Sequence, residues 1–360
     1  MKKFLVVLLA LACLGTLVYA EGATVGFGWG RVQFNVASGT SASGSEIMSG
    51  WTTGDSWPPM PRENLDLAYS GNFTSFQLTA YMGANPASVV DFMQFVNING
   101  TLKLIPDMVS FKIGEFNGDG FDAFRKTSPH PIRDVNNGNV GRMDGWGIIV
   151  DVAPKDSGFE AAVFYQVADP TVTPLATLNS TIGNTEVGAS YTLPSLLKVT
   201  AGAVVPNANL FNPGGTGYDR TIFGRVELLM VPNLTLWADA KYDGFDLATA
   251  VSNINAELAA GYSMGQLGIA FAGTFGSNGS PAVSSWGVSP EAWYNLGPVT
   301  AGLYFNLAQA DTSVSTMTYG FEPYVKLNDF NLRVSFHYMG STASGAISRW
   351  EVPILIDWGF

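Results

Sequence analysis

The fold class that the sequence predicts is all-β: a single antiparallel transmembrane β-barrel of about 18 strands, with 16 strands as the alternative. Three observations predict it. Short turn motifs recur along the chain, and residues of alternating polarity follow each one. Only 13% of the residues are charged, against about 25% in ordinary soluble domains. The last nine residues form an apolar stripe that ends in Phe360.

The first 20 residues have the features of a secretory signal peptide. Lys2 and Lys3 precede an apolar run that extends from residue 4 to about residue 17, and a small-residue cleavage site follows, ending at Ala20. We therefore expect residues 1–20 to be removed on export.

With that cleavage, residues 21–360 form the barrel, and this mature chain contains no cysteine and no disulfide. A lipoprotein site at Cys13 is the alternative, but it would cut the apolar run short. The full chain has 18 Lys and Arg against 29 Asp and Glu, a net charge of −11, which argues against nucleic acid as a partner. No apolar run of about 18 residues follows the leader, so the sequence predicts no membrane-spanning helix.

Eight short turn motifs divide the mature chain. They are rich in Pro, Asn, Asp and Gly, each of which favours tight turns for its own backbone reason. The motifs span residues 69–73, 105–108, 153–158, 193–196, 231–234, 264–267, 296–299 and 327–330. Period-two alternation follows each turn and predicts strands.

The number of turns predicts the number of strands. Eight short turns, with both ends of the chain on the same side, give nine strand pairs, or about 18 strands. A different reading of residues 89–104 gives 16. Short turns at one rim and long polar loops at the other are typical of barrels in bacterial outer membranes. A soluble sandwich would also alternate, but it would need neither the leader nor the low charge.

The terminal strand places Val352, Ile354, Ile356, Trp358 and Phe360 on one face. This stripe resembles the signature that the outer-membrane assembly machinery reads, so Trp358 and Phe360 are the expected contacts with that machinery. Together with the rhythm of turns and loops, it makes the whole mature chain resemble the bacterial outer-membrane porins. The resemblance is architectural, and no subfamily is identified.

This resemblance implies a water-filled channel in the bacterial outer membrane, surrounded by lipid, through which ions and small hydrophilic solutes diffuse passively. It implies no cofactor and no enzymatic activity. Porins of this size often assemble as homotrimers, although no feature of the sequence decides the oligomer. A substrate-selective channel for sugars or carboxylates, and a closed structural or adhesive barrel, are the alternatives.

If the apolar face of each strand meets lipid, the other face lines the channel. The charged residues expected there are Lys103, Lys112, Lys198, Arg225, Glu227, Asp239, Lys241, Asp243, Glu257, Glu291, Glu322, Arg333, Arg349 and Glu351, with Glu160 and Glu186 as further acidic members. Both signs alternate along single strands, so we expect partial neutralisation and a weak preference for cations.

Residues 116–143 form the longest charged loop and are the candidate for a constriction inside the barrel, a feature of general porins. Its charged candidates are Asp119, Asp122, Arg125, Lys126, Arg133 and Arg142. A loop that folds over the mouth is the alternative. The oxygen-rich segment 115–122 resembles a calcium loop, but Lys126 stands where the bidentate carboxylate belongs, so no metal site is expected.

Ser335 and His337 lie two residues apart and share a strand face that is expected to meet the lumen. A catalytic nucleophile needs a base within hydrogen-bond reach that a third group orients. Pairs of this kind arise often by chance, so we expect no catalytic residue. With only two histidines and no cysteine, the mature chain is not expected to bind zinc.

We predict that the protein isolated from outer membranes begins at Glu21, because the signal peptidase cleaves after Ala20. Intact-mass measurement of the purified protein tests this prediction. A mass that corresponds to a chain beginning at a lipid-modified Cys13 would contradict it.

Overall fold

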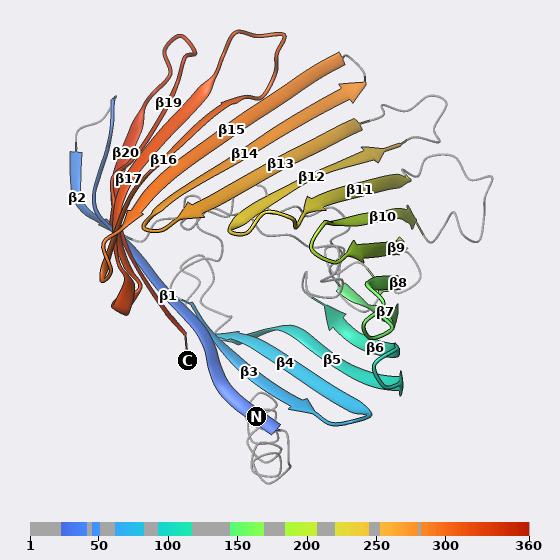
Figure 1. Ribbon diagram of the computed structural model, residues 1–360. Helices are drawn as coiled ribbons and strands as arrows, with labels where there is room; N and C mark the ends of the chain where they lie inside the picture. Colours follow the sequence, from blue (N-terminus) through green and yellow to red (C-terminus); the bar gives the residue numbers. More distant parts are fainter. Residues whose placement is uncertain are drawn as a thin grey trace.

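The computed structural model describes residues 23–41, 45–50, 62–82, 93–116, 145–168, 184–206, 220–244, 253–279 and 282–359. Nearly all of these residues lie in β-strands (Figure 1). No helix in these ranges is both long and apolar enough to span a membrane.

Twenty strand segments and one short 3-10 helix make up the described part of the chain. The first ten strands are β1 (Ala23–Thr40), β2 (Ser45–Gly50), β3 (Arg62–Ser70), β4 (Thr74–Met82), β5 (Met93–Ile105), β6 (Val109–Phe116), β7 (Gly145–Val152), β8 (Phe159–Ala168), β9 (Asn184–Leu193) and β10 (Leu197–Pro206). The remaining elements are β11 (Thr221–Leu228), β12 (Leu234–Asp243), β13 (Asn253–Met264), β14 (Leu267–Gly279), β15 (Ala282–Asn295), β16 (Val299–Gln309), β17 (Thr318–Leu327), η3 (Asn328–Phe330), β18 (Leu332–Ser335), β19 (His337–Ser341) and β20 (Arg349–Gly359).

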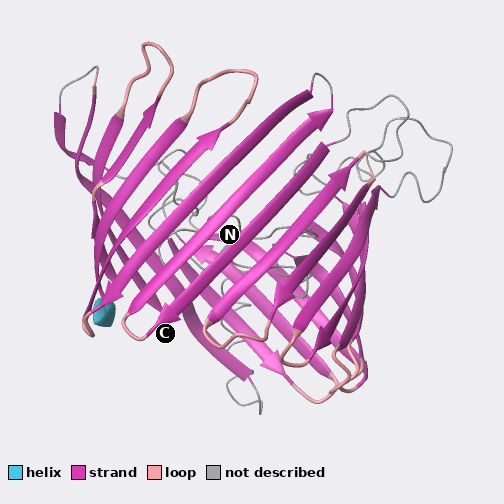
Figure 2. Cartoon of the chain, turned by 45° about the horizontal axis from the view of Figure 1, so that its top comes forward, coloured by secondary structure: helices cyan, strands magenta, loops and turns pink. Residues whose placement is uncertain are grey.

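The segments form one closed antiparallel ring (Figures 1 and 2). From β3 to β17 each strand pairs with the next along the chain. The ring closes at β1, which pairs with β20 on one edge and with β2 and β3 on the other. An antiparallel sheet that returns to its first strand has no unpaired edge strand, and this is the architecture of a barrel.

Two strands of the ring are each built from two segments. β2 and β3 pair with successive parts of β1. β18 and β19 pair with successive parts of β20, and a hydrogen bond from the Phe336 amide to the Pro323 carbonyl (3.0 Å) continues the pairing to β17 between them. The twenty segments therefore make up 18 barrel strands, the number that the turn count predicts.

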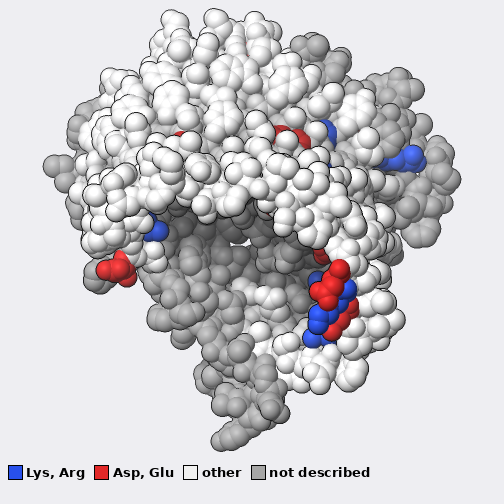
Figure 3. Space-filling view, viewed as in Figure 1, with Lys and Arg blue, Asp and Glu red and all other residues white. Residues whose placement is uncertain are grey.

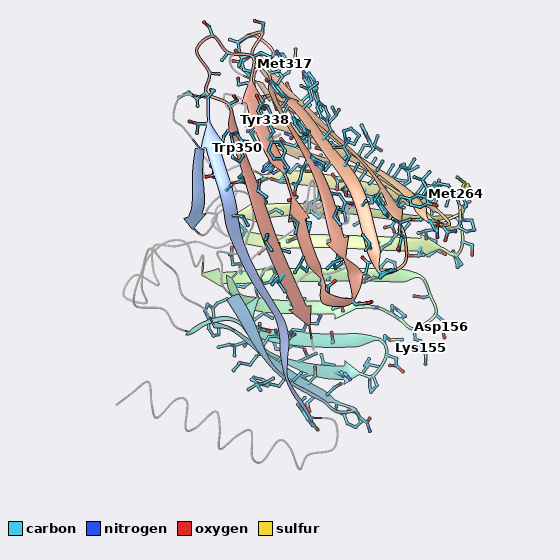
Figure 4. The ribbon with its side chains drawn as sticks, turned by 90° about the vertical axis from the view of Figure 1, so that its left-hand side faces the viewer. Lys155, Asp156, Met264, Met317, Tyr338 and Trp350 are labelled. Atoms are coloured by element: carbon cyan, nitrogen blue, oxygen red, sulfur yellow. The ribbon has the colours of Figure 1, made fainter. Side chains whose placement is uncertain are left out.

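All eight predicted short turns connect neighbouring strands at the same rim. Figure 4 shows Lys155, Asp156 and Met264 in turns at this rim and Met317 at the opposite rim. Six of the eight turns contain a residue with positive φ, and in a seventh such a residue directly follows the motif: Asp107, Asp156, Ser195, Asn233, Gly265, Gly297 and, after residue 330, Asn331. Gly, Asn and Asp tolerate this conformation better than other residues, which explains why these residue types mark the turns in the sequence.

Alternate residues divide between an outer and an inner face. On β14 Ile269 is 51% exposed, whereas the next residue, Ala270, is 5% exposed. On β20 Glu351, Pro353 and Leu355 are buried, and the residues between them are not. The exposed residues of the strands are mostly large and apolar, and the surface in Figure 3 is mostly uncharged around a central hollow. An apolar outer face with a polar interior is the pattern of barrels that cross outer membranes.

Aromatic side chains form a row on the outer face of β17 to β20. The row comprises Tyr319, Phe321, Phe336, Tyr338 and Trp350, and the ring centroids of its contacting pairs lie 5.3–6.2 Å apart. Tyr338 and Trp350 lie toward the rim that carries Met317 (Figure 4). Aromatic residues at this height match the girdle that outer-membrane barrels place where lipid tails meet headgroups.

Inner-face glycines allow aromatic rings to lie across neighbouring strands. Trp293 is the register partner of Gly268, and a Cβ atom added at Gly268 would lie 2.1 Å from the indole ring. Gly302 and Tyr324 form the same kind of pair, at 2.4 Å. Such glycine–aromatic pairs help to fix strand register, because a slip by one residue would move the ring to the other face.

We predict that Gly268→Ala destabilises the barrel by about 1–3 kcal/mol, because the new methyl group displaces the Trp293 ring from a packed position. The measurement is the temperature at which the folded, fast-migrating band on a gel converts to the unfolded band. Gly100→Ala is the matched control, because nothing lies within 4 Å of a Cβ at Gly100. Equal conversion temperatures for the two variants would contradict this account of the glycine.

Candidate functional site

The inner face of the barrel carries all fourteen charged residues that the sequence assigns to it. Five are buried, with at most 5% exposed: Arg225, Asp239, Glu291, Glu322 and Glu351. The other nine are partly exposed: Lys103, Lys112, Lys198, Glu227, Lys241, Asp243, Glu257, Arg333 and Arg349. The inner wall therefore has two layers of charge, one embedded between side chains and one within reach of the interior.

Arg225 on β11 and Asp239 on β12 form a buried ion pair. Register places the two residues directly opposite each other. The guanidinium donates from Nε and Nη2 to the same carboxylate oxygen, Oδ2, at 3.1 and 2.8 Å. The guanidinium carbon also lies 5.4 Å from the ring centre of Trp237, a cation–π distance. This cluster fixes the positions of three side chains on the inner face.

A second ion pair lies farther along β12. The Lys241 ammonium is 3.3 Å from Asp243 Oδ2, and these side chains are 41% and 20% exposed. The Thr221 hydroxyl also donates to Asp243, at 2.5 Å. Because this pair is partly solvated, its contribution to stability is small compared with that of the buried pair.

Glu291 on β15 is held by a tyrosine two strands away. The Tyr324 hydroxyl on β17 donates to Glu291 Oε1 at 2.8 Å. The strand between them, β16, has Gly302 opposite Tyr324, and the tyrosine ring lies where a side chain at Gly302 would stand. The missing side chain at Gly302 therefore lets Tyr324 reach Glu291.

Glu351 on β20 has two partners. His337 Nδ1 lies 3.2 Å from Oε1, and Arg349 Nη2 lies 3.1 Å from Oε2. Ser335 and His337 are both buried on the inner face, as the parity predicts. Glu351 is an orienting group for His337 that the sequence did not reveal. The Ser335 hydroxyl has no hydrogen-bond partner in the described part of the structure, so the serine is not paired with the histidine as a nucleophile would be.

One sector of the inner face is more apolar than the sequence predicts. Ile149 on β7 and Phe164 on β8 are at most 1% exposed, and Glu186 on β9 pairs in register with Phe164 and with Val204 on β10. Neither carboxylate oxygen of Glu186 has a hydrogen-bond partner among the described residues. The prediction of a polar inner face thus holds for β11 to β20 better than for β7 to β10.

Several predicted residues lie outside the described part of the structure. These are the loop candidates Asp119, Asp122, Arg125, Lys126, Arg133 and Arg142, between the end of β6 at Phe116 and the start of β7 at Gly145. The side chains of Trp358 and Phe360 also lie outside it. The constriction and the contact with the assembly machinery stay predictions.

Two aromatic residues are functional candidates that the sequence did not reveal. Trp237 and Tyr324 are buried on the inner face beside charged partners. Each shares a strand face with charged residues that the sequence assigns to the channel, Asp239 on β12 and Glu322 on β17. This alternation is the sequence feature from which they could have been predicted. In the ranges that the structure describes, no group of three His, Cys, Asp or Glu side chains is arranged to hold a metal ion.

No protein-family model matches the sequence, and no curated protein matches it either. Solved structures do resemble the fold. OccK10 (OpdN) of Pseudomonas aeruginosa has a TM-score of 0.53 at 11% identity and covers 94% of this chain and 100% of its own. Wzi of Escherichia coli, an outer-membrane protein involved in capsule assembly, has a TM-score of 0.52 at 9% identity and covers 99% of this chain and 88% of its own.

The loop-deleted form of OmpT, an outer-membrane protein of Vibrio cholerae, has a TM-score of 0.50 at 13% identity and covers 94% of this chain and 100% of its own. At such identities these similarities concern the fold alone. They confirm the predicted fold class: an antiparallel β-barrel of the kind found in bacterial outer membranes.

We predict that Arg225→Met destabilises the barrel by about 3–5 kcal/mol, because it leaves the Asp239 carboxylate buried without its counter-ion. Replacing both residues, as in Arg225→Met with Asp239→Leu, should cost less than the single change. Guanidinium unfolding of the protein in lipid vesicles, followed by tryptophan fluorescence, measures both effects.

The control for this prediction is Lys241→Met, which removes one partner of the solvated pair and should cost about 0–1 kcal/mol. If Lys241→Met and Arg225→Met cost the same, the distinction between the embedded and the solvated layer of charge is wrong.

Proposed function

We propose that the protein is an outer-membrane porin: a barrel through which ions and small hydrophilic solutes diffuse passively, with a weak preference for cations. The observation that carries the proposal is the division of a closed 18-stranded ring into an apolar outer face and an inner face with all fourteen predicted charged residues. The proposed function involves no covalent chemistry.

The size of the ring supports a channel. Barrels of 16 to 18 strands are wide enough to enclose water, whereas eight strands leave an interior that side chains fill. The partly exposed charges on the inner face, among them Lys241 and Arg349, favour a hydrated interior over a packed one.

The preference for cations rests on the balance of charge. The chain has 29 acidic and 18 basic residues. Acidic and basic side chains alternate on the inner face of single strands, for example Arg349 with Glu351, so much of the field cancels. The fourteen charged residues are seven acidic and seven basic, so the acidic excess of the inner face comes from the two further members, Glu160 and Glu186. Such a small excess in a wide pore gives weak selectivity, since rings of one sign are needed for strong selectivity.

We predict that the purified protein forms channels in planar lipid bilayers, with discrete ohmic steps and a reversal potential of cation-selective sign in a potassium chloride gradient. Protein that is shown to be folded by its gel mobility but forms no steps would contradict the proposal and would favour a closed structural or adhesive barrel. Conductance steps with a reversal potential of anion-selective sign would support the channel but contradict the preference for cations.

A further inference from the structure

Two neighbouring side chains on the inner face of β12 each have one buried polar atom without a partner. Trp237 is 1% exposed and Asp239 is 5% exposed. The Trp237 Nε1–H group and the Asp239 Oδ1 atom have no hydrogen-bond partner among the described residues. Since an unsatisfied buried polar group is costly, such atoms call for an explanation, and one explanation is a ligand.

Arg225 holds both side chains in place. Its guanidinium binds Oδ2 of Asp239 through two donors, which fixes the carboxylate and leaves Oδ1 available. The same guanidinium stacks over the Trp237 ring at 5.4 Å, which fixes the indole. The unpaired donor and acceptor therefore belong to a preorganised unit, and preorganisation is what a binding site requires.

The chemistry of the two free atoms selects the kind of ligand. An ammonium group only donates, so it would satisfy Asp239 and leave the indole N–H unpaired. A carboxylate only accepts, so it would satisfy Trp237 and be repelled by Asp239. Hydroxyl groups both donate and accept, so a solute with several hydroxyls can satisfy both atoms.

The surrounding charges favour the same class of ligand. The charge of Asp239 is balanced by Arg225, so the unit itself is close to neutral. Glu227 lies opposite Trp237 in register, and Glu257 lies opposite Asp239. These two glutamates flank the unit with negative charge and disfavour anionic solutes.

We propose that the unit formed by Arg225, Trp237 and Asp239 is a binding site for neutral, polyhydroxylated solutes such as sugar alcohols and sugars. The proposal rests on the proposed channel function, because the solute must enter the barrel to reach the inner face. It makes the barrel a channel with a preferred class of solute.

The free atoms are closed to solvent in this structure, so a solute reaches them only when a neighbouring side chain moves. Lys241 is the next residue on this face of β12, its side chain is 41% exposed, and its ion pair with Asp243 is partly solvated. A partly solvated pair of this kind is weak. Lys241 is therefore one neighbour on this strand whose side chain can move without breaking a strong interaction.

The experiment records channel conductance in planar bilayers as sorbitol is added, with each value normalised to the bulk conductivity of the same solution. Polyethylene glycol dimethyl ether of similar mass serves as the comparison solute, because its ether oxygens accept hydrogen bonds and it carries no hydroxyl group that could donate one. We expect sorbitol to lower the normalised conductance saturably, and the dimethyl ether to lower it without saturation.

Trp237→Phe removes the donor and keeps a ring beneath Arg225, and Asp239→Asn replaces the free acceptor. Trp237→Phe should raise the half-saturating sorbitol concentration about fivefold, the loss expected for one hydrogen bond. Asp239→Asn should raise it as well, because the hydrogen bond to a neutral amide lacks the charge assistance of the carboxylate. Trp286→Phe is the matched control. It lies on the outer face of β15, with its indole paired to Gln309 at 2.8 Å, and should leave the sorbitol response unchanged.

The outcomes separate this proposal from the proposed function. If channels form but sorbitol acts like the dimethyl ether, the site is wrong and the channel stands. If sorbitol lowers the conductance with the same half-saturating concentration in the wild type, Trp237→Phe and Asp239→Asn, the solute binds elsewhere and the assignment of the site is overturned. If folded protein forms no channel, both proposals fail. Should Asp239→Asn not fold, Trp237→Phe alone decides.

Discussion

Backbone hydrogen bonding is the constraint on which the rest of the structure depends. In the hydrocarbon region of a membrane no water is available to pair with peptide N–H and C=O groups, so a spanning sheet must close on itself. Here the closure falls on β1, which pairs with β20 from Trp29 to Thr40 along one edge and with β3 and β2 along the other. Once closed, the ring has an outside and an inside, and period-two alternation assigns every side chain to one of them.

The inner face then has to accommodate charge within a wall of packed side chains. Burying an isolated ionised group is costly. Most of the embedded charges accordingly have partners, whereas Glu186 has none among the described residues. Arg225 pairs with Asp239, Glu351 with His337 and Arg349, and Glu291 with the Tyr324 hydroxyl. Less deeply placed groups, such as Lys241, meet the interior directly. The proposed channel depends on this second layer, and the shape of the wall depends on the first.

The sequence predicts the features that depend on residues close together in the chain. It does not predict the side-chain contacts that depend on the register between strands. Turn residues and alternation are set within a few residues, so all eight turns, the strand number and the inner face could be predicted. The contact between Tyr324 and Glu291 needs two register pairings and a glycine between them, which one sequence does not reveal. The interruptions between β2 and β3 and between β18 and β19 were not predicted either. The apolar sector around Phe164 and Glu186 shows the limit of period-two alternation. Alternation predicts which side chains point inward, but it does not predict whether that part of the inner face is polar.

The central claim, that the two faces of each strand meet lipid and water respectively, is tested most directly by a cysteine scan of β13 in lipid vesicles. In a chain without Cys13, single substitutions Asn255→Cys and Glu257→Cys lie on the inner face, and Ile254→Cys and Leu258→Cys on the exposed outer face. The account predicts that a membrane-impermeant thiol reagent labels positions 255 and 257 and spares 254 and 258. Equal labelling at all four positions, or the reverse pattern, would contradict it.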